Sequence, residues 1–293
     1  MASEFDLLTE NAAELDIDLD RIPEVTRIDT DVDGNVVSSV QWTAESPRIV
    51  FLHGGGQNAH TWDSVILALG LPALAVDLPG HGHSGWREDH DYRPQPNAVA
   101  VAPVIRDLAP DAELVVGMSL GGLTTIAITA LDPRLIRRAL IVDVSPESPK
   151  RVEQLSGADR GTVALVSGPD TYDSRDELIE LTAAAAPGRS RSSIRRGVIH
   201  NTRELDDGRV QWRYDKMRES IEPGPLWDAL SASTIPLTLV RGGASAFVTD
   251  TDAAEIVRRR PGSEVISVPG AGHSVQSDAP LELAAIIRST LGL

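Results

Sequence analysis

Short apolar runs that break into glycine- or proline-rich loops constrain the fold of this 293-residue chain most strongly. Each run is apolar on both faces, which is typical of a strand in a parallel sheet that helices cover on both sides. The runs are RIVFLH (48–53), the start of ALAVDLPGHGHSG (73–85), ELVVGM (113–118), RRALIVDV (137–144), IPLTLVRGG (235–243) and SEVISV (263–268). The sequence therefore predicts an α/β fold with a mostly parallel central sheet.

Helical patterns of apolar residues separate most of these runs. They cover residues 60–69, 97–108, 120–133, 251–260 and 280–291. Before the first run, an alternating pattern over Val25–Trp42 surrounds Asp33-Gly34, which is a strong hairpin signal. The acidic, weakly periodic residues 1–24 are interpreted as a leader, either loose or forming one surface helix.

The alternation of strands and helices stops between residues 145 and 233. This segment is polar and rich in Arg, Asp and Ser, with a helical pattern over 174–186 and a possible turn at Asp207-Gly208 before VQWRY. It is too long for a simple connection and too poor in buried strands to extend the sheet. We therefore expect a mainly helical cap at 145–233, inserted into a core domain made of 25–144 and 234–293.

Composition excludes several classes of function. The formal net charge of −16 argues against binding to nucleic acid or to an anionic membrane surface, since both need clustered Lys and Arg. The chain has no cysteine, so disulfides, thiolate nucleophiles and cysteine metal sites are excluded. It also has no signal-peptide pattern and no apolar run long enough to span a membrane, so a cytoplasmic location is expected. The oligomeric state stays open.

The stretch Gly117-Met118-Ser119-Leu120-Gly121 is a G-x-S-x-G motif with a predicted strand before it and a predicted helix after it. A nucleophile on such a tight turn has unfavourable backbone angles, so side chains two positions away on either side would collide. The helix N-terminus also favours negative charge that develops nearby. The motif therefore predicts Ser119 as a nucleophile.

Four further motifs accompany this one in chain order. They are HGGG (53–56), DLPGHGHS (77–84), IVDVSP (141–146) and GAGHS (270–274), of which IVDVSP closes a predicted strand and the others follow one. From about Val25 onward the sequence thus resembles the α/β-hydrolase superfamily. The resemblance implies a serine hydrolase, similar to the esterases, with a cap over the core and no cofactor or metal.

Among the seven histidines, only His273 lies in the loop after the last predicted strand, where the family has its catalytic base. Gly270 and Gly272 leave that loop free to turn the imidazole toward Ser119. We expect His53 and His81 to have architectural roles in their loops, and His83 similarly. The others, His60, His90 and His200, carry no signal.

The catalytic acid is less obvious. Many superfamily members have it in the loop after the seventh strand, but here that loop reads GGASAF (242–247), with Ala246 where the aspartate is expected. Some small esterases have the acid after the strand that follows the nucleophile helix, where this chain has Asp143. We therefore predict Asp143, whose other interpretation is a carboxylate that fixes the base of the cap. Asp250 and Asp252 are the alternative acids, although either could simply begin the next helix.

An oxyanion hole needs two backbone donors. We expect them at Leu120, directly after the nucleophile, and at Gly55, in the loop after the first parallel strand. Four aromatic residues are candidates for lining a substrate pocket: Trp86, Trp212, Tyr214 and Trp227. No H-E-x-x-H pair suggests zinc, and a site made of Asp77, His81 and His83 is disfavoured.

These residues predict a serine hydrolase that cleaves a small soluble carboxylic ester through an acyl-enzyme. The nucleophile is not an aspartate, which argues against haloalkane dehalogenase and epoxide hydrolase chemistry. The same triad would also suit hydrolysis of a C–C bond, a lactone or an amide, or perhydrolysis. A third alternative is a non-catalytic member of this fold that binds a ligand or partner, which the missing acid at Ala246 keeps open.

Overall fold

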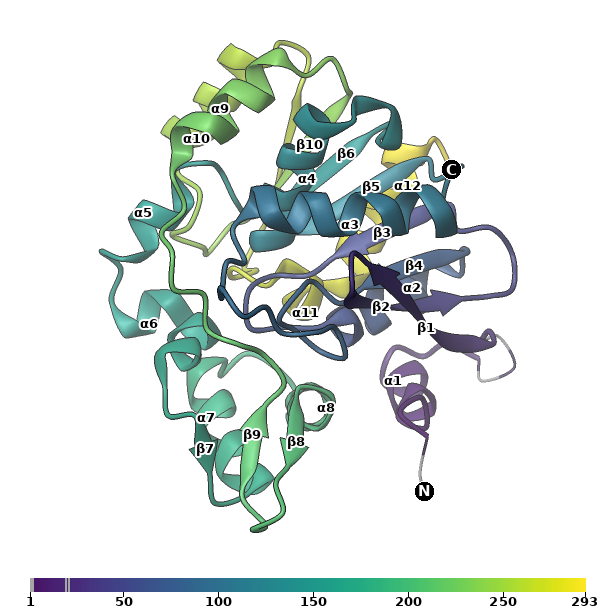
Figure 1. The fold of residues 1–293 in the computed structure, drawn as a ribbon, viewed down its shortest axis with the longest axis vertical. Coiled ribbons are helices and arrows are strands. Elements are labelled where there is room, and N and C mark those ends of the chain that lie inside the picture. The colour runs from purple at the N-terminus through teal and green to yellow at the C-terminus, as the bar shows by residue number, and fades with distance from the viewer. Residues whose placement is uncertain (1–2, 19, 21) are drawn as a thin grey trace.

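An eight-stranded sheet forms the centre of the computed structural model, which describes residues 3–18, 20 and 22–293 (Figure 1). β1 and β2 form an antiparallel hairpin, β2 runs antiparallel to β4, and the remaining pairs are parallel. This confirms the predicted fold class. In spatial order the strands are β1 (Val25–Val32), β2 (Asn35–Trp42), β4 (Ala73–Val76), β3 (Ile49–Leu52), β5 (Leu114–Met118), β6 (Ala139–Val142), β10 (Leu237–Gly242) and β11 (Glu264–Val268).

Helices cover both faces of the sheet (Figure 1). One face packs against α3 (Pro94–Leu108), α4 (Leu120–Leu131), α9 (Pro223–Ala232) and α10 (Asp250–Arg259). The other face packs against α1 (Leu8–Glu14), α2 (Asp63–Leu69), α11 (Val275–Asp278) and α12 (Pro280–Leu291). α3 begins before the predicted Asn97, because Pro94 suits the first turn of a helix.

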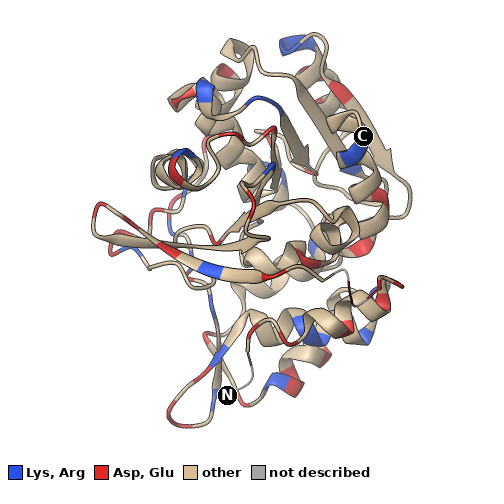
Figure 2. Cartoon of the chain, turned by 90° about the vertical axis from the view of Figure 1, so that its right-hand side faces the viewer, with Lys and Arg blue, Asp and Glu red and all other residues tan. Residues whose placement is uncertain are grey.

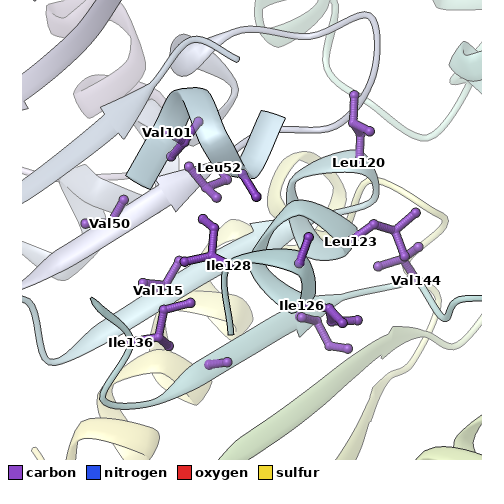
Figure 3. Packing of buried hydrophobic residues seen from close by; sticks show 14 of the residues in the cluster. Val50, Leu52, Val101, Val115, Leu120, Leu123, Ile126, Ile128, Ile136 and Val144 are labelled. Carbon is purple, nitrogen blue, oxygen red and sulfur yellow. The ribbon is translucent and has the colours of Figure 1, made fainter. Parts of the chain in front are cut away.

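Alternate residues of the central strands supply the two hydrophobic cores. In β3, Val50 and Leu52 point to the core beneath α3 and α4, whereas Ile49 and Phe51 point to the core beneath α2 and α12. Figure 3 shows the first of these cores, where α4 packs on β3 and β5. All four residues of β3 are fully buried, which explains why the strand is apolar on both faces.

Most of the segment predicted as a cap has a small core of its own. It contains α5 (Ser148–Val152), α6 (Gly157–Arg160), α7 (Arg175–Ala185), α8 (Arg191–His200) and the 3₁₀ helix η4 (Gly161–Ser167). A three-stranded sheet of β7 (Thr171–Tyr172), β9 (Val210–Trp212) and β8 (Thr202–Glu204) completes it. This segment adds no strand to the eight-stranded sheet. Its apolar residues, including Leu178, Ile194 and Trp212, form a separate cluster.

α9 differs from the rest of this segment, although it also lies within 145–233. Leu226 and Leu230 of α9 join the core of the main sheet, where α9 packs on α4 and lies beside α10 (Figure 1). The chain therefore returns to the core before residue 234. The reason is that the apolar face of α9 covers α4, which is a long-range contact that local periodicity does not show.

The N-terminal residues include a packed helix. Leu8 and Ala12 of α1 are buried in the core beneath α2, so this region matches the surface-helix alternative more closely than a loose leader. In the cartoon of Figure 2, Lys and Arg are interspersed with Asp and Glu along the chain. Within the described residues, no helix is long and apolar enough to cross a membrane.

Candidate active site

The turn between β5 and α4 presents Ser119 at the C-terminal edge of the parallel strands. Ser119 has φ of 50° and ψ of −117°, a conformation that L-residues rarely adopt. A Cβ atom on Gly117 would lie 2.4 Å from the carbonyl oxygen of Gly121, and one on Gly121 would lie 2.2 Å from that of Leu52. The two glycines of the motif are therefore required for α4 to pack this close to β3 and β5.

His273 reaches Ser119 from the loop after β11. Its Nε2 atom lies 3.1 Å from Ser119 Oγ, and its Nδ1 atom lies 2.8 Å from Asp143 Oδ2. With Nδ1–H donating to the carboxylate, the Nε2 lone pair faces the serine hydroxyl. The structure thus brings the three predicted residues into one hydrogen-bonded series.

Asp143 follows β6 and is fully buried. Its backbone also has a positive φ, of 49°. The backbone N–H of Gly242 donates to Oδ1 at 2.9 Å, and the hydroxyl of Ser245 donates to Oδ2 at 2.5 Å. Sequence reasoning did not single out Ser245, although it stands next to Ala246 in the loop where an acid was sought.

The two alternative acids lie elsewhere. The Asp250 side chain is 97% exposed and pairs with Arg241 at 2.7 Å. Asp252 pairs with Arg151 and completes a capping box with Thr249 at the start of α10. The structure therefore does not bring either carboxylate to His273.

The predicted oxyanion donors lie close together. A Cβ on Gly55 would lie 4.0 Å from the Leu120 side chain, so the two residues are neighbours. The N–H of Gly54 donates to Gln57 Oε1, and that of Gly56 donates to His81 Nε2. Between them, the N–H of Gly55 has no acceptor among the described residues, and Leu120 begins α4, where a helix leaves its N–H groups free.

Comparison with known proteins identifies the family. A model of the alpha/beta hydrolase family matches residues 49–286. The chain belongs to this family. Esterase Rv0045c of Mycobacterium tuberculosis (strain ATCC 25618 / H37Rv) is 51% identical to this hydrolase over 289 residues, which cover 98% of this chain and 95% of that protein.

Other comparisons agree. A solved structure of the M. tuberculosis esterase Rv0045c superposes with a TM-score of 0.90 at 50% identity, covering 100% of this chain and 99% of that one. The 2-(acetamidomethylene)succinate hydrolase of Mesorhizobium japonicum (strain LMG 29417 / CECT 9101 / MAFF 303099) is 25% identical, over 84% of this chain and 88% of that protein. This alpha/beta hydrolase is therefore an enzyme of the carboxylesterase-like type.

Two buried histidines hold the loops beside the site. Burial lowers the pKa of His53 to about 3, so the ring is neutral, with Nε2 accepting from Leu78 N–H and Nδ1 facing the Gly54 carbonyl. Burial also lowers the pKa of His81, whose Nε2 accepts from the Gly56 N–H. These contacts match the architectural roles that we expected for both rings.

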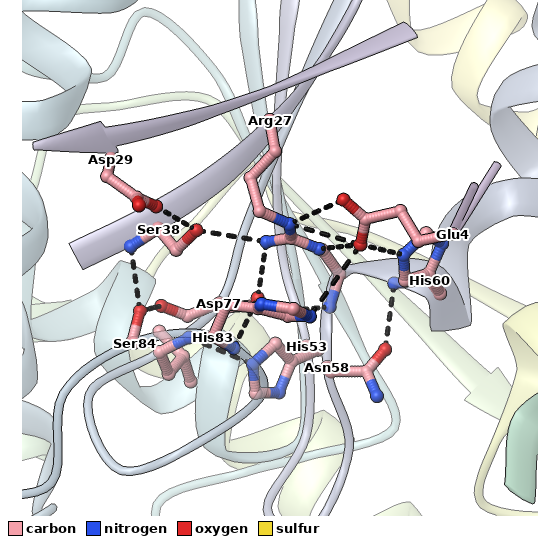
Figure 4. Close-up of polar contacts among 12 residues, drawn as sticks. Glu4, Arg27, Asp29, Ser38, His53, Asn58, His60, Asp77, His83 and Ser84 are labelled. Carbon is pink, nitrogen blue, oxygen red and sulfur yellow. Dashed lines mark hydrogen bonds and ion pairs between the residues drawn. The ribbon is translucent and has the colours of Figure 1, made fainter. Parts of the chain in front are cut away.

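Asp77 organises the same loops, as Figure 4 shows. It accepts hydrogen bonds from the backbone of Ala59 and His83, at 2.6 Å and 2.9 Å, and pairs with Arg27 at 2.8 Å. Because its oxygens have these partners and His81 Nε2 binds Gly56, Asp77, His81 and His83 do not form a metal site.

Two neighbouring cavities open at the site. The first, the active-site cavity, contains Ser119 and His273, and its wall is mostly aliphatic, including Met118, Leu123, Val144, Val152 and Ile221. The second, the polar chamber, lies between the core loop 55–64 and the cap. Gly55, Gln57, Val163 and Val166 line both cavities and separate them.

The four aromatic candidates lie in three different surroundings. Trp212 and Tyr214 line the polar chamber. Trp86 and Trp227 line neither of these two cavities. Trp86 is 40% exposed and packs under the guanidinium of Arg203. Trp227 packs into the main core through α9, and its Nε1 donates to Glu147.

One cluster could hold a metal ion. The ligand atoms of His60, Asp63 and His200 lie within 4.8 Å of one another, on the wall of the polar chamber. Burial alone would lower the pKa of His60, but the carboxylates of Asp63 and Glu4 raise it to about 9. The two imidazoles are stacked with ring centroids 3.8 Å apart. His60 is therefore already engaged as a charged group between carboxylates.

Proposed function

We propose that this hydrolase cleaves small carboxylic esters through an acyl-enzyme, with Ser119 as nucleophile, His273 as base and Asp143 as acid. The observation that carries the proposal is the hydrogen-bonded series from Asp143 Oδ2 through the His273 ring to Ser119 Oγ. Half of the residues are identical to those of an esterase along nearly the whole chain, which supports ester hydrolysis as the reaction.

The first half-reaction acylates the serine. Ser119 Oγ attacks the carbonyl carbon while its proton passes to His273 Nε2, and the carbonyl electron pair moves onto the oxygen. The N–H groups of Gly55 and Leu120 donate to this oxyanion. When the carbonyl re-forms, the bond to the alcohol oxygen breaks and His273 returns the proton to that oxygen.

The second half-reaction repeats these steps with water. His273 accepts a proton from the water, whose oxygen attacks the acyl carbon, and the oxyanion forms in the same place. Collapse then breaks the bond to Ser119 Oγ, which regains its proton, and the carboxylic acid leaves. The Asp143 carboxylate stabilises the imidazolium that forms twice in each cycle.

The active-site cavity favours substrates with an apolar part. Its aliphatic side chains suit the acyl chain of an aliphatic ester, and polar side chains line the rest of the wall: Gln57, Ser148, Glu153, Glu219 and Ser220. Such a small molecule is the only partner that the proposal needs. The cytoplasmic location remains a prediction from the sequence.

The test is turnover of p-nitrophenyl acyl esters by the wild type and by Ser119→Ala, Asp143→Asn and Asp250→Asn. We expect Ser119→Ala to be inactive and Asp143→Asn to lose about a thousandfold or more in kcat, because the imidazole loses its orienting acceptor. Asp250→Asn is the matched control and should keep wild-type activity, since its carboxylate is exposed and pairs with Arg241.

Two results would contradict the proposal. Absence of wild-type turnover together with no labelling by a fluorophosphonate would remove serine catalysis altogether. Full activity of Asp143→Asn with loss in Asp250→Asn would move the acid to the later loop.

A further inference from the structure

The loop between β10 and α10 binds the buried Asp143 carboxylate, although the loop itself does not contribute the catalytic acid. Ala246 occupies the position where an acid was sought, but the neighbouring Ser245 donates its hydroxyl to Asp143 Oδ2 at 2.5 Å. The direction of this hydrogen bond is clear, because Ser245 Oγ already accepts a hydrogen bond from the backbone N–H of Phe247 at 3.2 Å. The hydroxyl therefore acts as a donor to the carboxylate.

Ser245 and His273 share one oxygen atom. Asp143 Oδ2 accepts from His273 Nδ1 at 2.8 Å as well as from Ser245, while Oδ1 accepts from Gly242 N–H. With donors on both oxygens, the Asp143 carboxylate cannot rotate about its Cβ–Cγ bond without breaking at least one of these hydrogen bonds. Each of them is strengthened by the negative charge of the carboxylate. The hydroxyl also withdraws part of the negative charge that would otherwise face His273.

The same loop contacts the base directly. The Phe247 ring stacks on the His273 imidazole with centroids 3.4 Å apart and planes 15° apart. The Phe247 carbonyl in turn accepts from Ser148 Oγ at 2.7 Å and Arg151 Nη1 at 3.0 Å, which fixes the loop to the start of the cap. Two residues of one loop thus contact two of the three members of the series.

We propose that Ser245 is a positioning residue of this hydrolase, which fixes the rotation of Asp143 and sets how strongly the carboxylate binds the His273 imidazolium. The inference rests on the proposed function of Ser119, His273 and Asp143. Removing the hydroxyl has two separable effects. Looser orientation lowers kcat, and the more concentrated charge on Asp143 stabilises the imidazolium, so the acid limb of the pH–rate profile moves to higher pH.

The experiment compares Ser245→Ala, Ser245→Thr and Ser245→Val, because Thr keeps the hydroxyl that Val replaces with a methyl group of similar shape. With p-nitrophenyl butyrate, we expect Ala and Val to lose about tenfold in kcat with KM within about twofold. Their acid limb should move up by roughly half a pH unit. Thr should stay close to wild type, and Ser46→Ala, in the exposed loop between β2 and β3, is the matched control.

Proton NMR of the His273 Nδ1–H resonance gives a second readout, since its shift reports the bond to Asp143. We expect the resonance to move in the Val variant and not in the Thr variant. The inference is overturned if Ala and Val keep the wild-type kcat, or if kcat falls while the acid limb and the Nδ1–H resonance stay unchanged, which would mean a merely structural role. If Ala does not fold, the Thr and Val pair decides.

The controls separate this inference from the proposed function. An active Ser119→Ala variant, or a wild type without turnover, contradicts the proposed function whatever Ser245 does. If Ser119→Ala and Asp143→Asn are inactive but Ser245→Val behaves like wild type, only the role of Ser245 fails.

Discussion

Two members of the candidate site have a strained backbone conformation. Ser119 and Asp143 have φ of 50° and 49°, and each directly follows a buried parallel strand. A residue held in such a conformation costs about 1 to 3 kcal/mol and persists only where its surroundings fix it. Here the fixing contacts are backbone hydrogen bonds to the next strand: Ser119 N–H donates to Val142, and Asp143 N–H to Val240.

The glycines around Ser119 give a residue-scale prediction. Gly121→Ala would place a Cβ 2.2 Å from the carbonyl oxygen of Leu52, and neither β3 nor α4 can move without disturbing the core. We expect a loss of at least about 3 kcal/mol in the free energy of unfolding, or no folded protein at all. Thermal melting followed by circular dichroism measures it.

Gly157→Ala is the matched control, because no atom lies within 4 Å of the added Cβ in α6. Equal melting temperatures for the two variants would show that α4 has room to move at the nucleophile turn. That result would remove the steric reason for the second glycine of the motif.

At the scale of elements, α1 connects the core to the cap. Its apolar side packs beside α2, while Glu10 and Glu14 pair with Arg195 and Arg196 of α8. The Arg196 side chain is only 7% exposed, so its guanidinium charge is largely removed from water and is stabilised by these carboxylates. An acidic segment that looks like a loose leader is thus explained by partners far away in the sequence.

We predict that Glu10→Gln together with Glu14→Gln loosens the cap. The Arg196 guanidinium would lose its charged partners, and the melting temperature at pH 7 should fall by a few degrees, which corresponds to about 1 to 2 kcal/mol. Hydrogen bonds from Ser192 and Arg196 lower the pKa of Glu10, and those from Ser190 and Arg196 outweigh burial and lower the pKa of Glu14.

The sign of the pH dependence follows from these lowered pKa values. The stabilisation is present above the ordinary glutamate pKa of 4.5 and is lost as pH falls through the lower folded values. The double variant and the wild type should therefore converge in acid. Glu45→Gln, in the exposed loop before β3, serves as the control, and a constant difference at all pH values would contradict the ion-pair explanation.

For the whole molecule, the α/β fold could be predicted because each strand and helix carries its own local pattern. That Ser119 and His273 lie together could be predicted because a motif and a loop position mark them. The hydrogen bond of Ser245 to Asp143, the packing of α9 on α4 and the exposure of Trp86 could not be predicted, because each depends on contacts between segments far apart in the chain. Asp143 is intermediate, since its strand end was predicted but its partners Gly242 and Ser245 come from another strand.

The shifted pKa values of buried histidines predict how the stability of the whole molecule depends on pH. His60 donates to Asp63 through Nδ1 at 2.9 Å and to Glu4 through Nε2 at 3.3 Å. Burial opposes the charge, but these carboxylates raise the pKa of His60 to about 9, against an ordinary value of 6.5. The protonated His60 therefore contributes its full stabilisation of the folded protein below pH 6.5. This stabilisation is lost as pH rises toward 9, because His60 of the unfolded chain releases its proton at lower pH than His60 of the folded protein.

Below pH 6.5, the stability of the folded protein depends on histidines whose pKa values are lowered. Burial lowers the pKa of His53 to about 3, and burial with the charge of His60 lowers that of His200 to about 2. Below pH 6.5 the unfolded chain binds protons that these two rings do not accept in the folded state, so stability falls. Urea unfolding at a series of pH values should therefore show a maximum near pH 6.5.

His60→Gln tests the alkaline side of this profile. At pH 6 the variant should lose a few kcal/mol in the free energy of unfolding, and the difference from wild type should shrink as pH rises to about 9. His83→Gln is the matched control: burial and the charge of Arg27 lower the pKa of His83, so this variant should keep the wild-type decline above pH 6.5. A wild-type profile that is flat between pH 6.5 and 9 would mean that His60 is neutral in the folded protein, and the ion pairs with Asp63 and Glu4 would then be ordinary hydrogen bonds.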